Sequence, residues 1–439
     1  MTRGFYMVMA AQMLSSIADN ALLIAAIALI ADLHGPAWMV PMMKWWFALA
    51  YVVLAAFVGA ISDSFPKGRV MLMTNAIKFS GCALMFAHSY LFQSDGQQLM
   101  LVFVAYTIVG IGAAAYSPAK YGIVTEMLSP QDLVKGNSWI EGLTIISIIG
   151  GTLLGGWLTD DHVYQALKDT PYLTIFTRSH AEATIAVIGL IYIAAGVCNM
   201  LIPHTNVRYS KQETRPLVLI RDFKFYVLIL WRDKLGQISL AVTTLFWGAG
   251  ATLQLIVIEW GAHNFGYDIQ ESTKLMGTAA LGTVLGAVLA SRVSLRKSLK
   301  VLPMGVLMGL TVLLMPIVKS PWAIYGLLLM IGALSGYFVV PMNALLQHRG
   351  HVLLSAGHSI AVQNFNEQLN ILLMLGVYSF MLWLKLPINA IIVVFGLLVA
   401  SLMLVFIRWN RYNHRRNPRL SSLIGQKGHG RALAKFRIR

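Results

Sequence analysis

The chain has 439 residues, of which 57% are hydrophobic and only 12% are charged. Soluble domains contain about 45–50% apolar and about 25% charged residues, so this composition excludes a soluble globular protein and indicates a polytopic membrane protein. The formal net charge of +16 requires no nucleic-acid partner, because cations retained on the cytoplasmic side make a membrane protein basic. Both cysteines, Cys82 and Cys198, lie in apolar runs, which argues against a disulfide framework.

Apolar runs of about 20 residues, the length that crosses a bilayer as a helix, recur twelve times along the chain. The first run, 6–31, is too long for the core of a signal peptide, so we expect it to remain as the first span. The predicted spans are 6–31, 41–62, 70–91, 99–120, 138–158, 183–203, 237–260, 274–291, 301–318, 321–345, 358–382 and 387–407.

The distribution of basic residues predicts the orientation of these spans. With both termini in the cytoplasm, most of the 34 Lys and Arg residues fall on cytoplasmic segments, as the positive-inside rule requires. The longest cytoplasmic connection contains an apolar run that is too short to span and is flanked by charge, so we expect a helix on the inner membrane surface. The predicted domains are a six-helix half at 1–203, this linker at 204–236, a second six-helix half at 237–407 and a basic tail at 408–439. The tail either docks on anionic lipid or is solvated.

The stretch Gly110–Gly122 ends the fourth predicted span with small residues, Pro118 and Lys120. Small residues allow helices to pack closely in a bilayer, and a proline or lysine there needs protein or water around it. The tenth span repeats this pattern weakly, with Pro341 in the place of Pro118. Twelve spans with a central linker and such a repeat predict an all-α membrane protein of two pseudo-symmetric six-helix halves. Lys120 either snorkels to the membrane surface or contacts the substrate or a gate.

Polar side chains inside the spans are candidate site residues, because an intramembrane charge is costly unless it faces a cavity or a partner. Asp19 lies midway along the first span and is followed by Asn20. It is either a cavity group or one member of a structural ion pair. In the eleventh span, polar residues recur on one helical face, which predicts that this face lines the interior. These residues are Ser359, Gln363, Asn366, Glu367 and Asn370.

The loop after the second span, Gly59 to Arg69, resembles the signature loop of the Major Facilitator Superfamily. In that loop, glycine, aspartate and arginine lock neighbouring helices together on the cytoplasmic face. We therefore expect Asp63 and Arg69 to gate conformational change rather than to contact the substrate. The Gly68–Arg69 pair lies further from Asp63 than the usual pattern allows.

A larger set of motifs is far more specific. It consists of A-D-N-A-L-L at 18–23, D-S-F-P-K-G-R-V-M at 63–71, G-A-A-A-Y-S-P-A-K-Y-G-I at 112–123, L-F-W-G-A-G-A-T-L at 245–253, F-V-V-P-M-N-A-L-L-Q at 338–347 and A-V-Q-N at 361–364. With these motifs the chain resembles the bacterial lysophospholipid transporter family of the Major Facilitator Superfamily, from about residue 5 to residue 408.

This resemblance implies a flippase that moves lysophospholipids, chiefly lysophosphatidylethanolamine, to the cytoplasmic leaflet of a bacterial inner membrane without a cofactor. It also implies a functional partner, a cytoplasmic acyltransferase–acyl-carrier-protein synthetase that reacylates the product. Gln254 stands where relatives carry an arginine, and it can still donate a hydrogen bond to a lipid phosphate. By motif match the substrate-binding set is Asp19, Asn20, Tyr116, Lys120, Gln254, Asn343, Gln347, Gln363 and Glu367. We expect Asp19 and Glu367 to attract the ethanolamine ammonium and Lys120 to contact the phosphate.

Two other functions compete with this reading. A proton-coupled drug or metabolite exporter of the same superfamily would use Asp19 or Glu367 as its proton site. A membrane enzyme of lipid remodelling is favoured only by His263 and Asp268, which fit the H-x-x-x-x-D pattern of glycerolipid acyltransferases. By the predicted topology that pair lies in a short outer loop. The sequence has no P-loop, metal-ligand cluster or G-x-S-x-G motif, so we expect a transporter and no enzyme.

Overall fold

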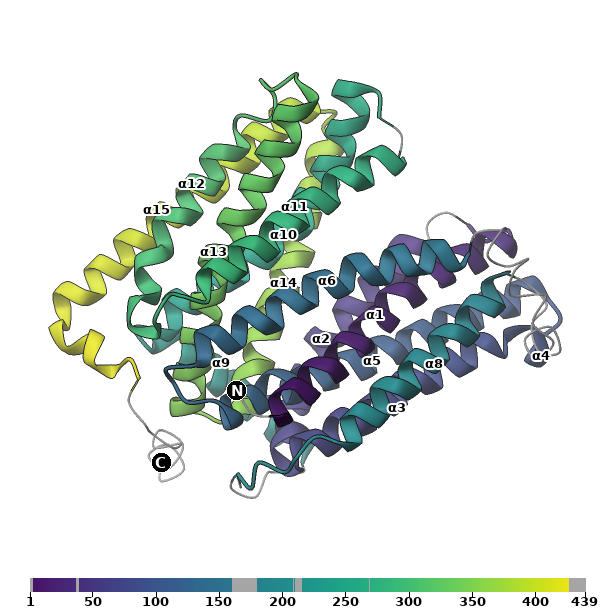
Figure 1. Ribbon diagram of the computed structural model, residues 1–439, viewed down its shortest axis with the longest axis horizontal. Helices are drawn as coiled ribbons and strands as arrows, with labels where there is room; N and C mark the ends of the chain where they lie inside the picture. The colour runs from purple at the N-terminus through teal and green to yellow at the C-terminus, as the bar shows by residue number, and fades with distance from the viewer. Residues whose placement is uncertain are drawn as a thin grey trace. The chain divides into compact units, whose positions relative to one another are not determined.

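The computed structural model of the protein describes residues 3–36, 39–159, 180–207, 209, 215–267 and 269–425. Within these residues all regular elements are helices, and eight of them are long and apolar enough to cross a membrane (Figure 1). The prediction of an all-α membrane protein is therefore confirmed. The eight are α1 (Arg3–Asp32), α2 (Met39–Ser64), α5 (Asp95–Met127), α6 (Leu133–Leu158), α8 (His180–Met200), α10 (Gly236–Phe265), α13 (Pro321–Leu353) and α15 (Ile388–Arg416).

The other helices are shorter or less apolar, and four of them overlap the remaining predicted spans. Those four are α3 (Lys67–Phe86), α11 (Ile269–Ala290), α12 (Leu302–Val312) and α14 (Ala356–Trp383). The rest are α4 (His88–Leu91), α9 (Pro216–Arg232) and the short 3-10 helices η1 (Leu295–Val301) and η2 (Pro418–Leu423).

Several helices differ in length from their predicted spans, and α5 and α12 are two examples. α5 continues beyond Lys120 to Met127, with Pro118 inside it. A proline removes one intrahelical hydrogen bond, but a transmembrane helix tolerates it where neighbouring groups satisfy the freed carbonyl. α12 ends at Val312, and the chain continues in turns in which Met315 N donates to Val312 O at 3.0 Å.

The chain forms two compact units, each with its own core. Unit 1 comprises Met1–Ile123 and Ser147–Gln212, and unit 2 comprises Val124–Ile146 and Glu213–Arg439. The segment Val124–Ile146, which we call the α5–α6 hairpin, contains the end of α5 and the start of α6, and it packs within unit 2. The domain boundaries expected from the sequence stay a prediction.

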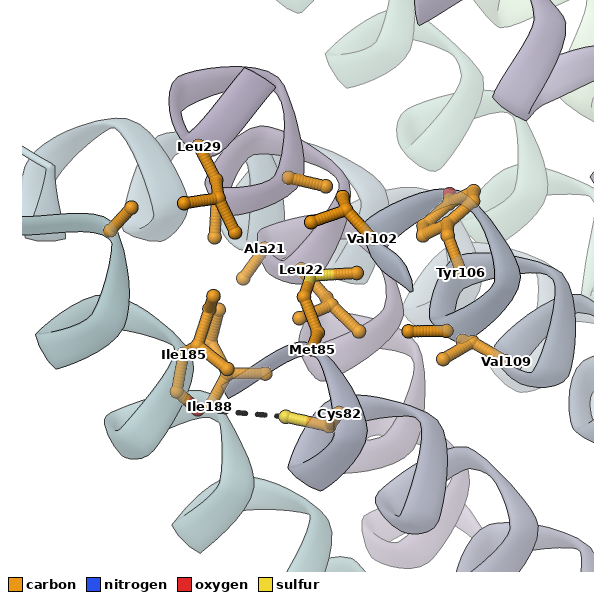
Figure 2. Close-up of a cluster of buried hydrophobic side chains, with 14 of the residues drawn as sticks. Ala21, Leu22, Leu29, Cys82, Met85, Val102, Tyr106, Val109, Ile185 and Ile188 are labelled. Carbon is orange, nitrogen blue, oxygen red and sulfur yellow. Dashed lines mark hydrogen bonds between the residues drawn. The ribbon is translucent and has the colours of Figure 1, made fainter. Parts of the chain in front are cut away.

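Unit 1 is built around α8, which packs against both α1 and α3. Its apolar core joins side chains of α1, α3, α5 and α8, among them Leu22, Tyr106 and Ile188 (Figure 2). Cys82 lies in this core as a free thiol, with its Sγ 3.5 Å from Ile185 O. Burial of these side chains fixes which faces of the helices point inward. It thereby positions the polar residues that lie one turn further along the same faces.

α13 is the central helix of unit 2, because it packs against α10, α11, α12 and α14. Its approach to α11 is especially close, since Gly332 and Gly336 lie directly against carbonyl oxygens of α11. Gly282 and Gly286 of α11 lie in the same way against carbonyl oxygens of α13. A side chain at any of these four positions would collide with backbone, so small residues permit the packing.

The linker contains a helix where the sequence predicts one. α9 begins with Pro216 at its first position, where a missing N–H costs nothing. It packs on α10 and α14, and Trp231 Nε1 donates to Asn366 Oδ1 at 3.2 Å. Exposed Leu217 and Phe225 lie on its outer surface. Such an amphipathic helix fits the inner membrane surface, which stays a prediction.

The first part of the predicted tail is ordered against unit 2. After α15 the chain turns through η2 and buries Leu420 and Ile424. Gly425 N then donates to His348 Nε2 at 3.0 Å. Residues 426–439 lie outside the described residues, so docking of the tail on lipid stays a prediction.

Candidate functional site

Asp19 of α1 and Lys78 of α3 form a buried ion pair in unit 1, with 2.9 Å between Lys78 Nζ and Asp19 Oδ2. The Lys78 side chain is 1% exposed and that of Asp19 is 18% exposed. At 1.5 Å per residue, Lys78 lies roughly 16 Å along α3, deep within the predicted span. Asp19 therefore has a partner cation, which was one of the two possibilities that its position allowed.

Three more side chains surround this pair. Tyr192 of α8 donates its hydroxyl to Asp19 Oδ1 at 2.7 Å. Lys78 Nζ donates to Ser15 Oγ and lies 4.6 Å from the ring centre of Tyr116, which is a cation–π distance. These five residues, Ser15, Asp19, Lys78, Tyr116 and Tyr192, form what we call the Asp19–Lys78 cluster.

The apolar core of unit 1 adjoins this cluster on one side. Figure 2 shows Leu22, Cys82 and Ile188 in that core. In sequence each of them is one helical turn from a member of the cluster, on α1, α3 and α8 respectively. Because these neighbours are apolar, water screens the charges weakly, and their interaction with each other or with a ligand is strong.

The other predicted residues of unit 1 make different contacts. Asn20 is half-buried, and its amide donates to Ser16 O at 2.8 Å within α1. Lys120 is also half-buried, with its Nζ 4.3 Å from the ring centre of Tyr121. Neither of these contacts joins the Asp19–Lys78 cluster.

A second polar cluster in unit 2 links α6, α13 and α14. Asn343 of α13 donates to Glu141 Oε1 of α6 at 2.9 Å and accepts from Gln363 of α14 at 3.0 Å. Gln363 Nε2 also donates to Glu367 Oε1 at 2.8 Å. All four side chains are buried, and we call them the Glu141 cluster. Three of the four were predicted as site residues.

An amide pair lies one helical turn from this cluster. Asn137 of α6 and Gln347 of α13 exchange hydrogen bonds of 2.8 and 3.0 Å, and both side chains are buried. Because Asn137 precedes Glu141 by four residues and Gln347 follows Asn343 by four, the two sets of contacts stack along the helices. The α5–α6 hairpin is therefore joined to α13 by polar contacts at two successive levels.

The polar face predicted for the eleventh span does point inward. Ser359 is buried like Gln363 and Glu367, while Asn366 and Asn370 are half-buried. Asn370 Nδ2 donates to Thr244 O of α10 at 2.9 Å. Gln254, by contrast, lies at an exposed position of α10, outside the Glu141 cluster.

The two predicted gating residues are not paired with each other. Asp63, near the end of α2, instead forms an ion pair with Lys67, the first residue of α3, with 2.9 Å between Oδ1 and Nζ and both side chains buried. Arg69 is exposed, and with Lys67 and His204 it lines a cavity of about 200 Å³ at the start of α3. The position of Lys67 at the start of α3, just after the turn that follows α2, places its ammonium within reach of the carboxylate.

The described residues contain no group of three or more His, Cys, Asp and Glu side chains that would hold a metal ion. The imidazole of His263 is exposed, with Nδ1 3.0 Å from Asn264 Oδ1. Asp268, the second member of the acyltransferase-like pattern, lies outside the described residues.

Sequence reasoning missed Ser15, Lys78, Tyr192 and Glu141 of the two clusters and Asn137 of the amide pair. Lys78 lies well inside the predicted span 70–91 but was not singled out as an intramembrane cation. Glu141 lies inside the span 138–158, so its intramembrane carboxylate was the same signal that identified Asp19. Tyr192 and Asn137 carry no charge, and only the fold brings them to their partners.

Apolar helices of spanning length that enclose two clusters of ionisable and amide groups define a multi-pass membrane transporter. The sequence profile of the Major Facilitator Superfamily matches residues 8–373, and the chain belongs to that family.

The chain is 41% identical over 392 residues to the lysophospholipid transporter LplT of Yersinia enterocolitica, which covers 89% of this chain and 90% of that protein. It is 39% identical over 412 residues to the lysophospholipid transporter LplT of Enterobacter sp. (strain 638), and the match covers 93% of this chain and 96% of that protein. These similarities confirm the family resemblance that the motifs indicated.

Solved structures agree on the fold. A bacterial homologue of the iron transporter ferroportin, in an outward-facing state, has a TM-score of 0.69 at 13% identity, with 93% of this chain and 100% of that chain covered. The Major Facilitator Superfamily transporter FucP, in the outward conformation, has a TM-score of 0.66 at 14% identity, with 94% and 99% covered. At these identities the likeness extends to the fold alone.

Proposed function

We propose that the protein moves lysophospholipids, chiefly lysophosphatidylethanolamine, to the cytoplasmic leaflet of a bacterial inner membrane. The observation that carries this proposal is the similarity to lysophospholipid transporters over nearly the whole of both chains. The distribution of Lys and Arg supports cytoplasmic termini. The product would be reacylated by a cytoplasmic acyltransferase–acyl-carrier-protein synthetase, which is the functional partner that the family resemblance implies.

The chemistry of the two clusters suits this substrate class. A lysophospholipid has one acyl chain, which can stay among apolar side chains or in lipid, and a polar head that needs a few charged or hydrogen-bonding groups. Asp19 can bind the ethanolamine ammonium, and Glu367 is a second carboxylate for the same role. The amides Asn343, Gln347 and Gln363 can donate to phosphate or glycerol oxygens.

The remaining predicted contacts belong to the same proposal. Tyr116 would donate its hydroxyl to the head, Asn20 and Gln254 would contribute amide contacts, and Lys120 would contact the phosphate or the gate. Asp63 and Arg69 are proposed to act in gating, with Lys67 as the direct partner of Asp63.

The α5–α6 hairpin is proposed to be a movable clasp within unit 2. Its contacts with α13 are hydrogen bonds between amide and carboxylate side chains, each worth about 0.6 kcal/mol in membranes, so a few of them can be exchanged for others at low cost. Release of Asn137 from Gln347 and of Glu141 from Asn343 would free polar groups for a substrate head.

Uptake by spheroplasts tests the proposed function. Spheroplasts that express the protein should take up labelled lysophosphatidylethanolamine faster than spheroplasts without it. Asp19→Ala and Glu367→Gln should each reduce that uptake. If both variants transport like the wild type, the proposed binding roles are wrong.

The rival function, a proton-coupled exporter, predicts a different response to energy. Collapse of the proton gradient with a protonophore should leave lysophospholipid uptake unchanged, whereas an exporter would stop. A lipid-remodelling enzyme would instead form an acylated product from lysophospholipid and an acyl donor, and the purified protein is expected to form none.

A further inference from the structure

Folding alone does not require the buried ion pair of Lys78 and Asp19. Replacing a buried ion pair with apolar residues of similar volume is often neutral or stabilising, while removing one partner is costly. Lys78 is 1% exposed, among apolar neighbours, inside a predicted membrane span. Ionisable residues kept at such depth belong to substrate pathways more often than to packing.

The pair is arranged to accept a ligand. The Asp19 side chain is 18% exposed and is therefore partly accessible, whereas that of Lys78 is 1% exposed. The hydroxyl of Tyr116 is buried without a partner at hydrogen-bonding geometry among the described residues, with Ser15 and Asn199 nearby. A buried donor without an acceptor costs stability unless a ligand uses it. The Tyr116 ring lies against Lys78 Nζ, so one phosphate group could contact both the hydroxyl and the ammonium.

We propose that Lys78 is the phosphate-binding residue and that the Asp19–Lys78 pair opens to exchange its internal partner for the zwitterionic head of the substrate. This inference rests on the proposed function. In the empty protein each charge is neutralised by the other. In the loaded protein the phosphate pairs with Lys78 and accepts from Tyr116, and the ethanolamine ammonium pairs with Asp19. With the ethanolamine lipid each buried charge thus keeps a counter-ion in both states, which keeps the exchange inexpensive.

The exchange predicts which headgroups depend on which residue. Every lysophospholipid carries the phosphate, so Lys78 is needed for all of them. Of the ethanolamine and glycerol heads only ethanolamine carries a cation, so Asp19 discriminates between lysophosphatidylethanolamine and lysophosphatidylglycerol. In this proposal Lys78, which is more deeply buried than Lys120, contacts the phosphate in place of Lys120.

The test uses the purified full-length chain in liposomes and measures inward movement of the two labelled lipids separately. Lys78→Gln should lower both rates by at least about tenfold, the effect of one lost charge-assisted hydrogen bond. Asp19→Asn should lower the transport rate of lysophosphatidylethanolamine by a similar factor and that of lysophosphatidylglycerol much less. Uptake of neither lipid by the wild type would refute the proposed function itself, whereas uptake by the wild type without this pattern would refute only the exchange.

A purely structural ion pair predicts the opposite pattern. Each single variant would then impair both lipids equally, and the double variant Asp19→Asn/Lys78→Gln would restore transport by removing the unpaired charge. That restoration would overturn the proposal, and the proposal predicts that the double variant stays inactive.

Tyr116→Phe tests the same proposal without removing a charge, and it therefore remains informative if the Asp19 and Lys78 variants do not fold. It removes only a hydroxyl that has no partner in the described structure and leaves the ring against Lys78, so the fold should be preserved. Transport of both lipids should fall, while the control Tyr378→Phe, at a buried tyrosine of α14, should transport like the wild type. Unchanged transport by Tyr116→Phe would overturn the placement of the phosphate.

Discussion

Replacing Gly332 of α13 by alanine should destabilise the protein, whereas the same replacement at Gly326 of that helix should not. A Cβ at Gly332 would collide with the carbonyl oxygen of Ala279 on α11. At Gly326 an added Cβ would have no heavy atom within 4 Å. Because both glycines lie in one helix, the two variants gain the same helix propensity from alanine and differ only in the steric cost of the added methyl group.

The two terms can be given magnitudes. Alanine is favoured over glycine inside a helix by about 0.5–1 kcal/mol. Overpacking costs about 1–3 kcal/mol, and here the obstacle is a backbone carbonyl that a side-chain rotation cannot move. We therefore expect Gly332→Ala to lose about 0.5–2 kcal/mol and Gly326→Ala to gain up to about 1 kcal/mol.

The assay is unfolding of the purified protein in detergent micelles by heat or denaturant. Because α13 carries Asn343 and Gln347, separation of α11 from α13 should also lower transport in Gly332→Ala. Equal stability changes in the two variants, or a gain in Gly332→Ala, would refute the close packing of α11 and α13.

Three further outcomes follow from single contacts. Gln347→Leu removes both hydrogen bonds to Asn137, so a cysteine placed in the α5–α6 hairpin should react faster with a thiol reagent, and unchanged labelling would contradict the clasp. Lys67→Met should lower liposome transport more than Arg69→Gln, because Lys67 holds Asp63, and the reverse order would show that Arg69 matters more to gating than the Asp63–Lys67 contact. Arg349→Gln breaks hydrogen bonds of 2.7 and 3.1 Å to Asp233, so it should lower the free energy of unfolding by about 1.5–3 kcal/mol. The control is Arg296→Gln, at an exposed arginine, and equal stability of the two variants would contradict a stabilising role of the Arg349–Asp233 pair.

The fold was predictable because its main determinant is local. A run of apolar residues must satisfy its own backbone hydrogen bonds in a bilayer, so each of the twelve runs had to be helical. The end of α5 was harder to place, because Pro118 is a helix breaker in water and is tolerated here by its surroundings.

The site was predictable only in part, because its contacts are not local. Asp19 could be chosen from its depth in a span, but its partner Lys78 lies 59 residues away, on another helix. Asn343 was predicted from its motif, whereas Glu141, 202 residues away, is joined to it only by the fold. The partner of Asp63 depends on the turn between α2 and α3, which brings Lys67, the first residue of α3, to the carboxylate.

The proposed function can be measured as inward movement of labelled lysophosphatidylethanolamine into liposomes that contain only this protein. The label should become protected from extraction by external albumin, without ATP or an ion gradient, at a rate that rises with the amount of protein. Protection no faster than in protein-free liposomes would contradict it.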